Sequence, residues 1–167
     1  MSGKLVALVI LACAAIGGAA MYYLQVFAYY ERTPDQAALE LLASEERVQE
    51  IAIENYQGID ADSSPLRYRA CFDLETAPAD VDGVPYEGAV PRNAPFWFSC
   101  FDAEEIGAQI ASGEARVLTV ARNIEFGIDR VVALTEAGRG YVWQEVNDCG
   151  EKAYDGTPLG DDCPTRE

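Results

Sequence analysis

Carboxylates are the main chemically competent side chains in this sequence, because its 167 residues include 28 Asp and Glu but no histidine. Histidine is the commonest general base and the commonest transition-metal ligand, so this chain lacks the usual residue for general-base catalysis and for binding a transition metal. Two carboxylates facing each other in a pocket would instead support acid–base hydrolysis, as in glycosidases. With so many acids in the chain some pair lies close by chance, so composition alone does not identify a catalytic site.

The segment GIDADSSP combines serines with acids and raises two further chemistries. Ser63 and Ser64 lack a histidine base, and no motif places Lys152 beside them. Asp60 and Asp62 offer oxygen ligands for calcium, but the segment lacks the glycine and glutamate of an EF-hand loop. We therefore interpret it as a surface turn, and we expect no catalytic residue, no cofactor and no metal site.

Arg67 and Arg69 are conspicuous because the chain has only 12 basic residues. They lie two positions apart on a predicted strand and are candidates for contact with an anion or a partner protein. The alternative is internal pairing, because arginine binds carboxylates well. The acids considered for such pairing are Asp60, Asp62 and Asp73.

Four cysteines follow the N-terminal segment, with no C-x-x-C pair and no histidine. This pattern favours two structural disulfides over a zinc site. We predict a Cys71–Cys100 bond, because both residues precede Phe-Asp and a long loop would let their strands lie side by side. We predict a Cys149–Cys163 bond, because it would fasten a tail rich in Gly, Pro and Asp.

Residues 5–24 carry no charge and would form a helix about 30 Å long, the thickness of a bilayer core. We predict an uncleaved anchor over residues 1–30, with membrane contact along residues 5–30. The alternatives are a signal peptide cleaved after Ala20 and a lipoprotein signal ending at Cys13. Apolar sequence continues past both sites and favours the anchor. An aromatic belt is expected at Tyr22, Tyr23, Phe27, Tyr29 and Tyr30.

Lys4 is the only charged residue before Glu31, so residues 31–167 carry a net charge of −17. The flanking charges and the predicted disulfides favour a cytoplasmic N-terminus and an exported domain over residues 31–167, in the periplasm or an equivalent oxidising space. Its charge excludes a nucleic-acid binder and would attract a basic periplasmic partner. Within the anchor, Ala14 and Gly18 would allow close approach of another integral membrane protein.

An α+β domain with a mostly antiparallel sheet and one main helix is expected after the transmembrane helix. The helix should follow Asp102, an N-cap residue, and end near Gly113. Residues 37–47 also suit a helix, so strand and helix both stay open there. Alternation and turn residues predict strands over 37–43, 48–55, 66–74, 96–101, 115–121, 129–135 and 140–146.

Over nearly its whole length the chain resembles an uncharacterised family of alphaproteobacterial single-pass membrane proteins, which is known only as a domain of unknown function. The resemblance implies a location in the bacterial inner membrane, with the domain in the periplasm. Four stretches carry the resemblance: YYLQVFAYYE, GIDADSSPLRYRACF, FDAEEIGAQIASGEA and FGIDRVVALTEAGRGYVWQEVNDCGEKAYDGTPLGDDCP. Family members tend to carry a histidine where this chain has Gln144. The resemblance implies no activity. Some members carry a histidine-kinase label, but this chain has neither a phosphoacceptor histidine nor an ATP-binding glycine motif.

Two functions are compatible with these patterns. The first is a non-catalytic, membrane-anchored accessory protein, a small subunit of or partner to an inner-membrane complex that exposes an acidic periplasmic domain. The alternative is a carboxylate-dependent hydrolase of the cell envelope. A concave pocket with two facing acids would favour the hydrolase, and a convex domain would favour the accessory protein.

Overall fold

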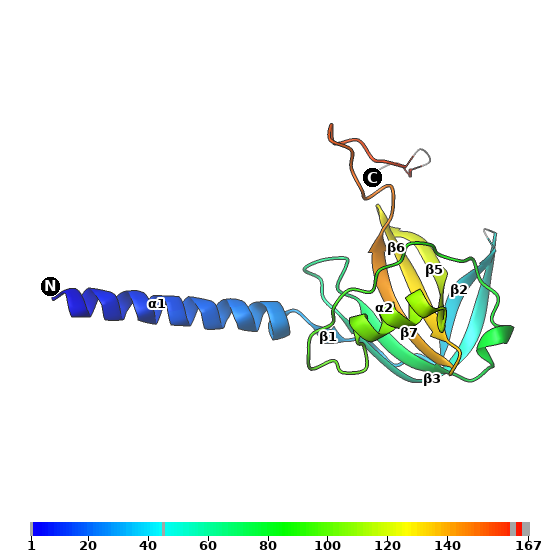
Figure 1. The fold of residues 1–167 in the computed structure, drawn as a ribbon, viewed down its shortest axis with the longest axis horizontal. Helices are drawn as coiled ribbons and strands as arrows, with labels where there is room; N and C mark the ends of the chain where they lie inside the picture. The colour runs from blue at the N-terminus through cyan, green and yellow to red at the C-terminus, as the bar shows by residue number, and fades with distance from the viewer. Residues whose placement is uncertain (1, 45, 161–162, 165–167) are drawn as a thin grey trace.

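A long N-terminal helix leads into a β-rich domain in the computed structural model, which describes residues 2–44, 46–160 and 163–164 (Figure 1). The strand pairs are antiparallel, and one main helix packs on the sheet, as expected for the predicted α+β class. In chain order the elements are α1 (Gly3–Tyr23), the π-helical turn η1 (Leu24–Ala28), β1 (Glu31–Arg32), β2 (Ala38–Ser44), β3 (Arg47–Asp60), β4 (Arg69–Leu74), the 3-10 turn η2 (Pro78–Asp80), α2 (Ala103–Ser112), β5 (Ala115–Glu125), β6 (Ile128–Thr135) and β7 (Arg139–Val146).

The first two helical elements form one apolar run, Gly3–Ala28, of 26 residues, and an 18-residue window within it has a mean hydropathy of 2.3. At 1.5 Å per residue this run is longer than a bilayer core is thick. No residue of α1 is buried by the rest of the chain (Figure 1). The length and exposure suit a membrane anchor or an N-terminal signal sequence.

The seven strands form one curved sheet with the order β1-β3-β4-β7-β6-β5, and β2 adds to β3. The first half of β3 pairs with β2, and its second half pairs with β1 and β4. This confirms the predicted hairpin and excludes the helical alternative for residues 37–47, apart from position 45, which lies outside the described residues. Asn55 has a positive φ of 53° at a bulge, which lets β3 bend and continue to Asp60, beyond the predicted end at 55.

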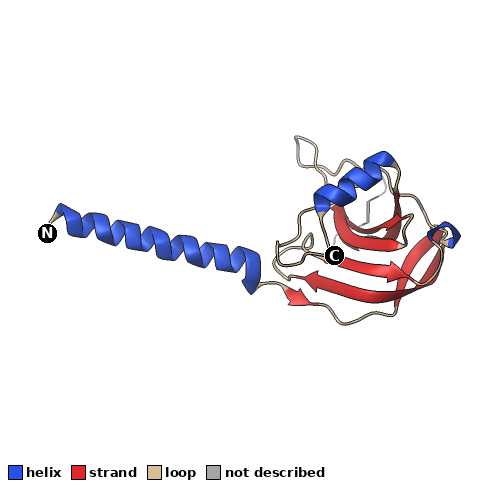
Figure 2. Cartoon of the chain, turned by 60° about the horizontal axis from the view of Figure 1, so that its bottom comes forward, coloured by secondary structure: helices blue, strands red, loops and turns tan. Residues whose placement is uncertain are grey.

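The loop between β4 and α2 brings the two ends of the curved sheet together. The Val84 N–H donates to the Leu42 carbonyl of β2 at 2.8 Å, and the Val84 carbonyl accepts from Thr119 of β5 at 2.8 Å. Tyr86 adds a main-chain bond to Val117 at 3.0 Å. The segment therefore lies between β2 and β5 and closes the sheet toward a barrel (Figure 2).

Side chains alternate between the two faces along each strand, and each face carries a cluster of buried apolar residues. The inner face holds Leu41, Phe72 and Val142, and the outer face holds Trp143 beneath Ile106 of α2. Gly140 is opposite Phe72, and a Cβ at Gly140 would lie 2.1 Å from the Phe72 ring. A larger residue at this position would therefore displace the core.

The predicted helix is confirmed, and its ends are capped as the sequence indicates. The Asp102 carboxylate accepts from the N–H groups of Glu104 and Glu105 at 3.0 and 3.2 Å, and Gly113 ends the helix with φ 83°.

The predicted strand over 96–101 is wrong. These residues form turns with local bonds, Phe98 N–H to Pro95 and Phe101 N–H to Phe98. Phe98 and Phe101 pack under α2, whereas Phe96 and Trp97 contact Phe27 in η1. The local bonds make the chain turn here, so the large side chains pack on two separate elements without a strand.

Candidate functional site

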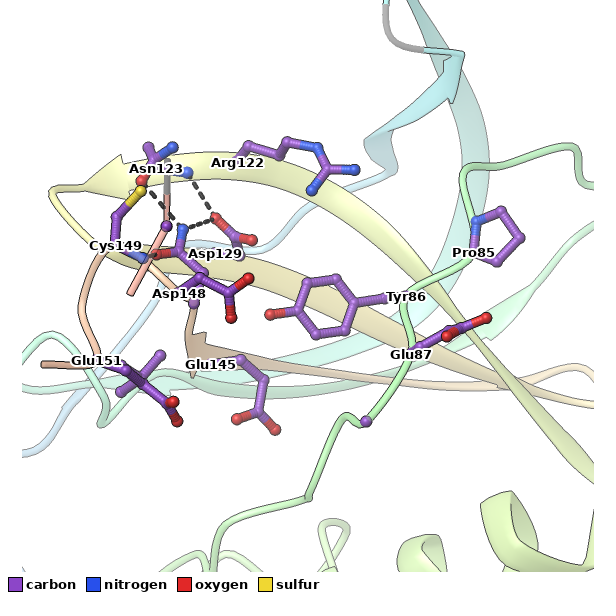
Figure 3. Close-up of a pocket in the computed structure, with 14 residues that line it drawn as sticks. Pro85, Tyr86, Glu87, Arg122, Asn123, Asp129, Glu145, Asp148, Cys149 and Glu151 are labelled. Atoms are coloured by element: carbon purple, nitrogen blue, oxygen red, sulfur yellow. Dashed lines mark hydrogen bonds between the residues drawn. The ribbon is translucent and has the colours of Figure 1, made fainter. Parts of the chain in front are cut away.

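The domain has a cavity of about 700 Å³ that is rich in carboxylates. It lies between the loop segment 85–88, the facing parts of β5, β6 and β7, and the start of the C-terminal tail (Figure 3). We call this site the acidic cavity. Its charged lining residues are Glu87, Arg122, Asp129, Glu145, Asp148 and Glu151.

Asp129 is the most deeply buried of these acids, with 2% exposure. Its Oδ1 accepts from the Asn123 N–H at 2.8 Å and from the Asn147 side-chain amide at 2.7 Å. The same Asn147 amide donates to Asn123 Oδ1 at 3.0 Å, and Asn147 Oδ1 accepts from the Cys149 N–H at 3.0 Å. The carboxylate therefore holds the turn between β5 and β6 against the tail.

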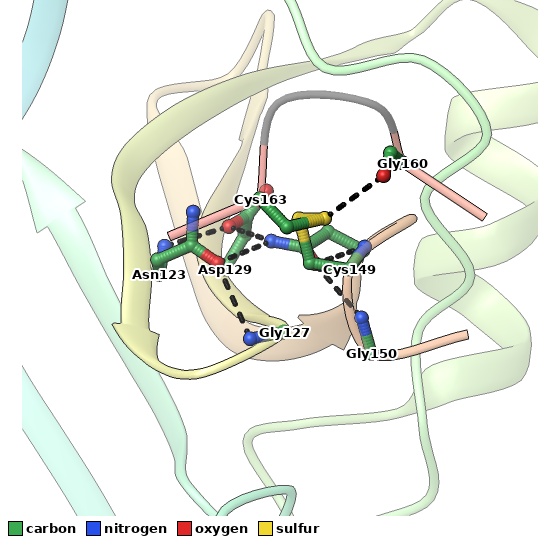
Figure 4. The surroundings of a disulfide bond; sticks show 8 residues. Asn123, Gly127, Asp129, Cys149, Gly150, Gly160 and Cys163 are labelled. Atoms are coloured by element: carbon green, nitrogen blue, oxygen red, sulfur yellow. Dashed lines mark hydrogen bonds between the residues drawn. A yellow bond between two sulfur atoms is a disulfide. The ribbon is translucent and has the colours of Figure 1, made fainter. Parts of the chain in front are cut away.

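The tail is fastened beside this network by the predicted Cys149–Cys163 disulfide, whose Cα atoms are 5.5 Å apart (Figure 4). Gly127 and Gly150 are in backbone contact, since a Cβ at Gly127 would lie 2.3 Å from the Gly150 Cα. Asn123 adopts a positive φ of 47° and accepts from the Gly127 N–H through its side chain. The turn therefore depends on an asparagine and two glycines for close packing.

Glu145 connects the acidic cavity to the long loop. Its Oε1 accepts from the buried Trp143 indole N–H at 2.7 Å and from the Val90 N–H at 2.6 Å. Its Oε2 lies 3.7 Å from a guanidinium nitrogen of Arg92. Like Asp129, this acid already binds groups of its own chain.

Tyr86 projects into the acidic cavity toward Asp129 and Asp148 (Figure 3). Burial, reinforced by the negative charges of Asp129 and Glu145, raises the pKa of Tyr86 to about 12. The hydroxyl therefore remains protonated at neutral pH. Among the described residues, no group of three or more Cys, Asp or Glu side chains is arranged to hold a metal ion.

The two predicted arginines have different positions. Arg69 is 3% exposed and donates to the carbonyls of Arg92, Leu66 and Tyr68 at 2.8, 2.9 and 2.6 Å. Burial lowers its pKa to about 10, which leaves it charged at neutral pH. Its hydrogen-bond acceptors are main-chain carbonyl groups, so Arg69 positions the loop and does not face an external anion.

Arg67 is half-buried and lies close to the end of the anchor. Its guanidinium is 5.4 Å from the centre of the Tyr30 ring. Its Nη1 is buried without a hydrogen-bond partner among the described residues. Of the acids considered as alternatives, Asp73 instead binds Arg139 at 2.8 Å and Asn55 at 2.9 Å, which lowers the pKa of its carboxyl.

Aromatic side chains join the anchor to the domain, in a region that we call the junction (Phe27, Tyr30, Phe96 and Trp97). The Trp97 indole N–H donates to the Val26 carbonyl at 2.9 Å. Phe27 stacks on Trp97 with ring centres 6.4 Å apart and meets Phe96 edge-on at 5.9 Å. Tyr30 meets Trp97 edge-on at 5.8 Å. These contacts attach the loop directly to the end of the anchor helix.

The other disulfide, Cys71–Cys100, is present with Cα atoms 6.2 Å apart and joins β4 to the turn that follows the junction residues. The pairing is as predicted, although Cys100 lies in a turn and not on a neighbouring strand. Ala14 and Gly18 are exposed on α1, and apart from the helix's own backbone no described residue lies within 4 Å of a Cβ placed at Gly18. That anchor surface is therefore open.

Gln144 occupies the position where the resembling family tends to carry histidine. It is buried, and in the amide orientation that satisfies both ends it donates to the Pro65 carbonyl and accepts from Arg130 at 3.0 Å. Its role here is therefore to pair buried polar groups.

Sequence reasoning did not identify two features of these regions. These are the amide network of Asn123 and Asn147 around Asp129 and the hydrogen bond from Trp97 to Val26. Asparagine and glycine on either side of β6 indicate turns, but not which turn contacts the tail.

Comparison with known proteins identifies one family. Residues 39–164 match the profile of a family of unknown function, DUF6446. No curated protein and no solved structure shows significant similarity to the chain.

Proposed function

The chain belongs to the DUF6446 family, whose function is unknown, and from its geometry we propose that it is a non-catalytic, membrane-anchored accessory protein. In this proposal it is a small subunit of, or partner to, an inner-membrane complex. The anchor contacts an integral membrane protein, and the acidic domain covers the outer face of the complex.

The junction is the observation that carries this proposal. An enzyme that acts on freely diffusing substrates needs only a flexible tether to the membrane. Here Trp97 binds Val26 at 2.9 Å and stacks on Phe27, so the domain has a defined position relative to the anchor. A fixed position is what a protein needs when it contacts one partner both within and outside the membrane.

The proposed compartment is the periplasm of a bacterium, with the N-terminus in the cytoplasm. Two disulfides support an oxidising compartment for the domain. Lys4 before the anchor favours the same orientation. Labelling of one added cysteine in intact cells and in spheroplasts would test it, at an exposed position away from both disulfides such as Ser112.

The acidic surface supports recognition of a basic periplasmic partner. Residues 31–167 carry a net charge of −17, which attracts a basic protein over about a Debye length. Binding that depends on this surface should weaken from low to physiological salt. Binding that persists in high salt would instead indicate apolar contacts along the anchor.

Copurification of the tagged full chain from mild detergent tests the accessory role. We expect one membrane protein in a fixed ratio, lost or much reduced in an Ala14→Leu/Gly18→Leu variant, because two leucines prevent close helix approach. Ala12→Leu is the matched control, since at 100° per residue Ala12 lies on another side of the helix. Equal recovery of the partner with wild type and with both variants would contradict the role of this surface. Failure to find any partner even after crosslinking would contradict the proposal.

A carboxylate-dependent hydrolase of the cell envelope is the second candidate, because the acidic cavity brings Asp129 and Glu145 to one site. Such an enzyme needs one acid to donate a proton and another to accept one. Both residues instead accept short hydrogen bonds from main-chain and side-chain donors. Hydrolysis of envelope glycans by wild type that is lost in Glu145→Gln, with the fold retained, would favour the hydrolase.

A further inference from the structure

A groove of about 390 Å³ separates the anchor from the loop that precedes β4. Four anchor residues form its apolar wall, and polar side chains gather at the end next to the domain. Apart from the helix's own backbone, no described residue lies within 4 Å of a Cβ placed at Gly17, so the groove is open along the helix. The wall consists of Gly17, Ala20, Met21 and Leu24, and the polar end of Gln25, Tyr29, Ser63 and Arg67.

Arg67 is the charged group of this groove. Its Nη1 is buried but has no hydrogen-bond partner among the described residues, and leaving such a donor unpaired is costly. Tyr30 stacks against the same guanidinium at 5.4 Å and keeps it beside the anchor. No described carboxylate lies within ion-pair distance of it.

The groove runs from acyl-chain depth to headgroup depth if α1 crosses a bilayer. Gly17 and Leu24 are seven residues apart, which corresponds to about 10 Å along a helix. In a membrane-spanning α1, the segment from Gly17 to Leu24 would lie among the acyl chains of the leaflet next to the domain. Tyr29 and Arg67 would lie at the membrane interface, where aromatic and basic groups are favoured.

We propose that this groove binds one anionic phospholipid of the leaflet next to the domain, with its phosphate at Arg67 and an acyl chain along Gly17–Leu24. Charge complementarity favours this occupant over a neutral lipid, because an arginine fork matches a phosphate oxygen pair. Ser63 and Tyr29 add hydroxyl groups at the same end. In the lining of the neighbouring hollow three acids, Glu31, Asp60 and Asp62, outnumber the one cation, Arg32. That hollow therefore disfavours an anionic headgroup, and Arg67 sets its position. The inference rests on the proposed membrane anchoring of α1.

Tryptophan fluorescence of the full chain in lipid nanodiscs provides the test. The chain has two tryptophans, and Trp143 is fully buried in the domain, so Trp97 at the junction is the one near lipid. Tyr30 contacts both Trp97 and Arg67, which places this reporter beside the groove. The probes are phosphatidylglycerol and phosphatidylcholine carrying bromine, a quencher, on the acyl chain near the headgroup, each at the same mole fraction in phosphatidylcholine discs.

We expect brominated phosphatidylglycerol to quench more strongly, with a relative binding constant of about five, the effect of one basic side chain near an anionic surface. Arg67→Gln should lower this ratio to about one, and Arg67→Lys should retain most of it because the charge remains. Arg32→Gln is the matched control, since it also removes one positive charge near the interface but lies outside the groove.

Equal quenching by both lipids in wild type would overturn the proposal, as would a preference that survives in Arg67→Gln. Weak quenching by both would indicate a groove closed to lipid, as when a partner helix fills it, and would also overturn it. Recovery of the chain with the nanodiscs is measured first. A chain that does not enter the discs contradicts the membrane anchoring itself, whereas a chain that enters without lipid preference contradicts only this inference.

Discussion

The acidic cavity and the junction are held by different interactions, although the loop over residues 76–101 contributes to both. In the acidic cavity, Asp129 and Glu145 accept hydrogen bonds of 2.6–2.8 Å from donors of the same chain. At the junction, aromatic rings hold the loop on the anchor, and Arg67 beside them keeps an unpaired nitrogen. The buried acids therefore bind donors of their own chain, whereas Arg67 lines the groove for which we propose a lipid.

The difference also concerns what each region positions. The acidic cavity joins the β5–β6 turn to the C-terminal tail, so its network acts within the domain. The junction joins the domain to α1, so its contacts determine how the domain is positioned relative to the apolar helix. Substitutions in the two regions should therefore separate domain stability from domain orientation.

The largest expected effect comes from the Cys71–Cys100 bond, which anchors the loop shared by both regions. Replacing both cysteines by alanine should lower the free energy of unfolding by about 3–4 kcal/mol, as expected for a closed loop of this size. Denaturant unfolding of the full chain in detergent measures the loss. The Cys149→Ala/Cys163→Ala variant is the matched comparison, and it should leave the junction intact because it loosens only the tail. A loss of less than about 1 kcal/mol for the first pair would show that packing alone holds the loop.

Asp129→Ala should destabilise the domain by about 2–3 kcal/mol, because the Asn123 and Asn147 donors lose their acceptor. Asp148→Ala removes an exposed acid from the same cavity and should change stability by less than about 0.5 kcal/mol. Thermal unfolding of both variants in detergent gives the comparison. Similar stability of the two variants would mean that the acids of the cavity are not structural.

Trp97→Phe should cost about 1 kcal/mol, since it removes the hydrogen bond to Val26 and keeps most ring packing. The expected result is faster amide hydrogen exchange over residues 24–30, with unchanged protection in β5–β7. Val90→Ala, on the same loop but away from the junction, should leave both regions unchanged. If Trp97→Phe instead loosens β5–β7, the junction is part of the domain core and the separation between the regions fails.

The smallest expected effect is a pH dependence of the acidic cavity. Burial and nearby carboxylates raise the pKa of Tyr86 from 10.0 to about 12. Above pH 10 the unfolded state loses this proton first, so the stabilising contribution present below pH 10 disappears as the pH rises toward 12. The tyrosinate absorbance of Tyr86 is obtained by subtracting the titration curve of Tyr86→Phe from that of wild type. This difference curve should have its midpoint near pH 12. A midpoint at pH 10 would mean that the hydroxyl is freely solvated.

Local patterns were sufficient to predict the apolar helix, the β2–β3 and β6–β7 hairpins and the capped α2. Each depends on residues close in sequence, such as Asp102 and Gly113 at the ends of α2. The disulfide pairing was also predicted, although Cys100 turned out to lie in a turn. Strand 96–101 was predicted wrongly because alternating large residues suit both a strand and a turn that packs on two elements.

The sequence by itself determined where the membrane-compatible helix, the acidic domain and the cysteines lie, because apolar length, charge and residue type are properties of the chain. The tertiary structure decided which polar groups meet. It buried Arg69 among carbonyls, left Arg67 beside the anchor, and brought Asn123, Asp129 and Asn147 together from three separate segments. These contacts depend on strand register and on the path of a long loop, and neither is specified by the residues adjacent to them.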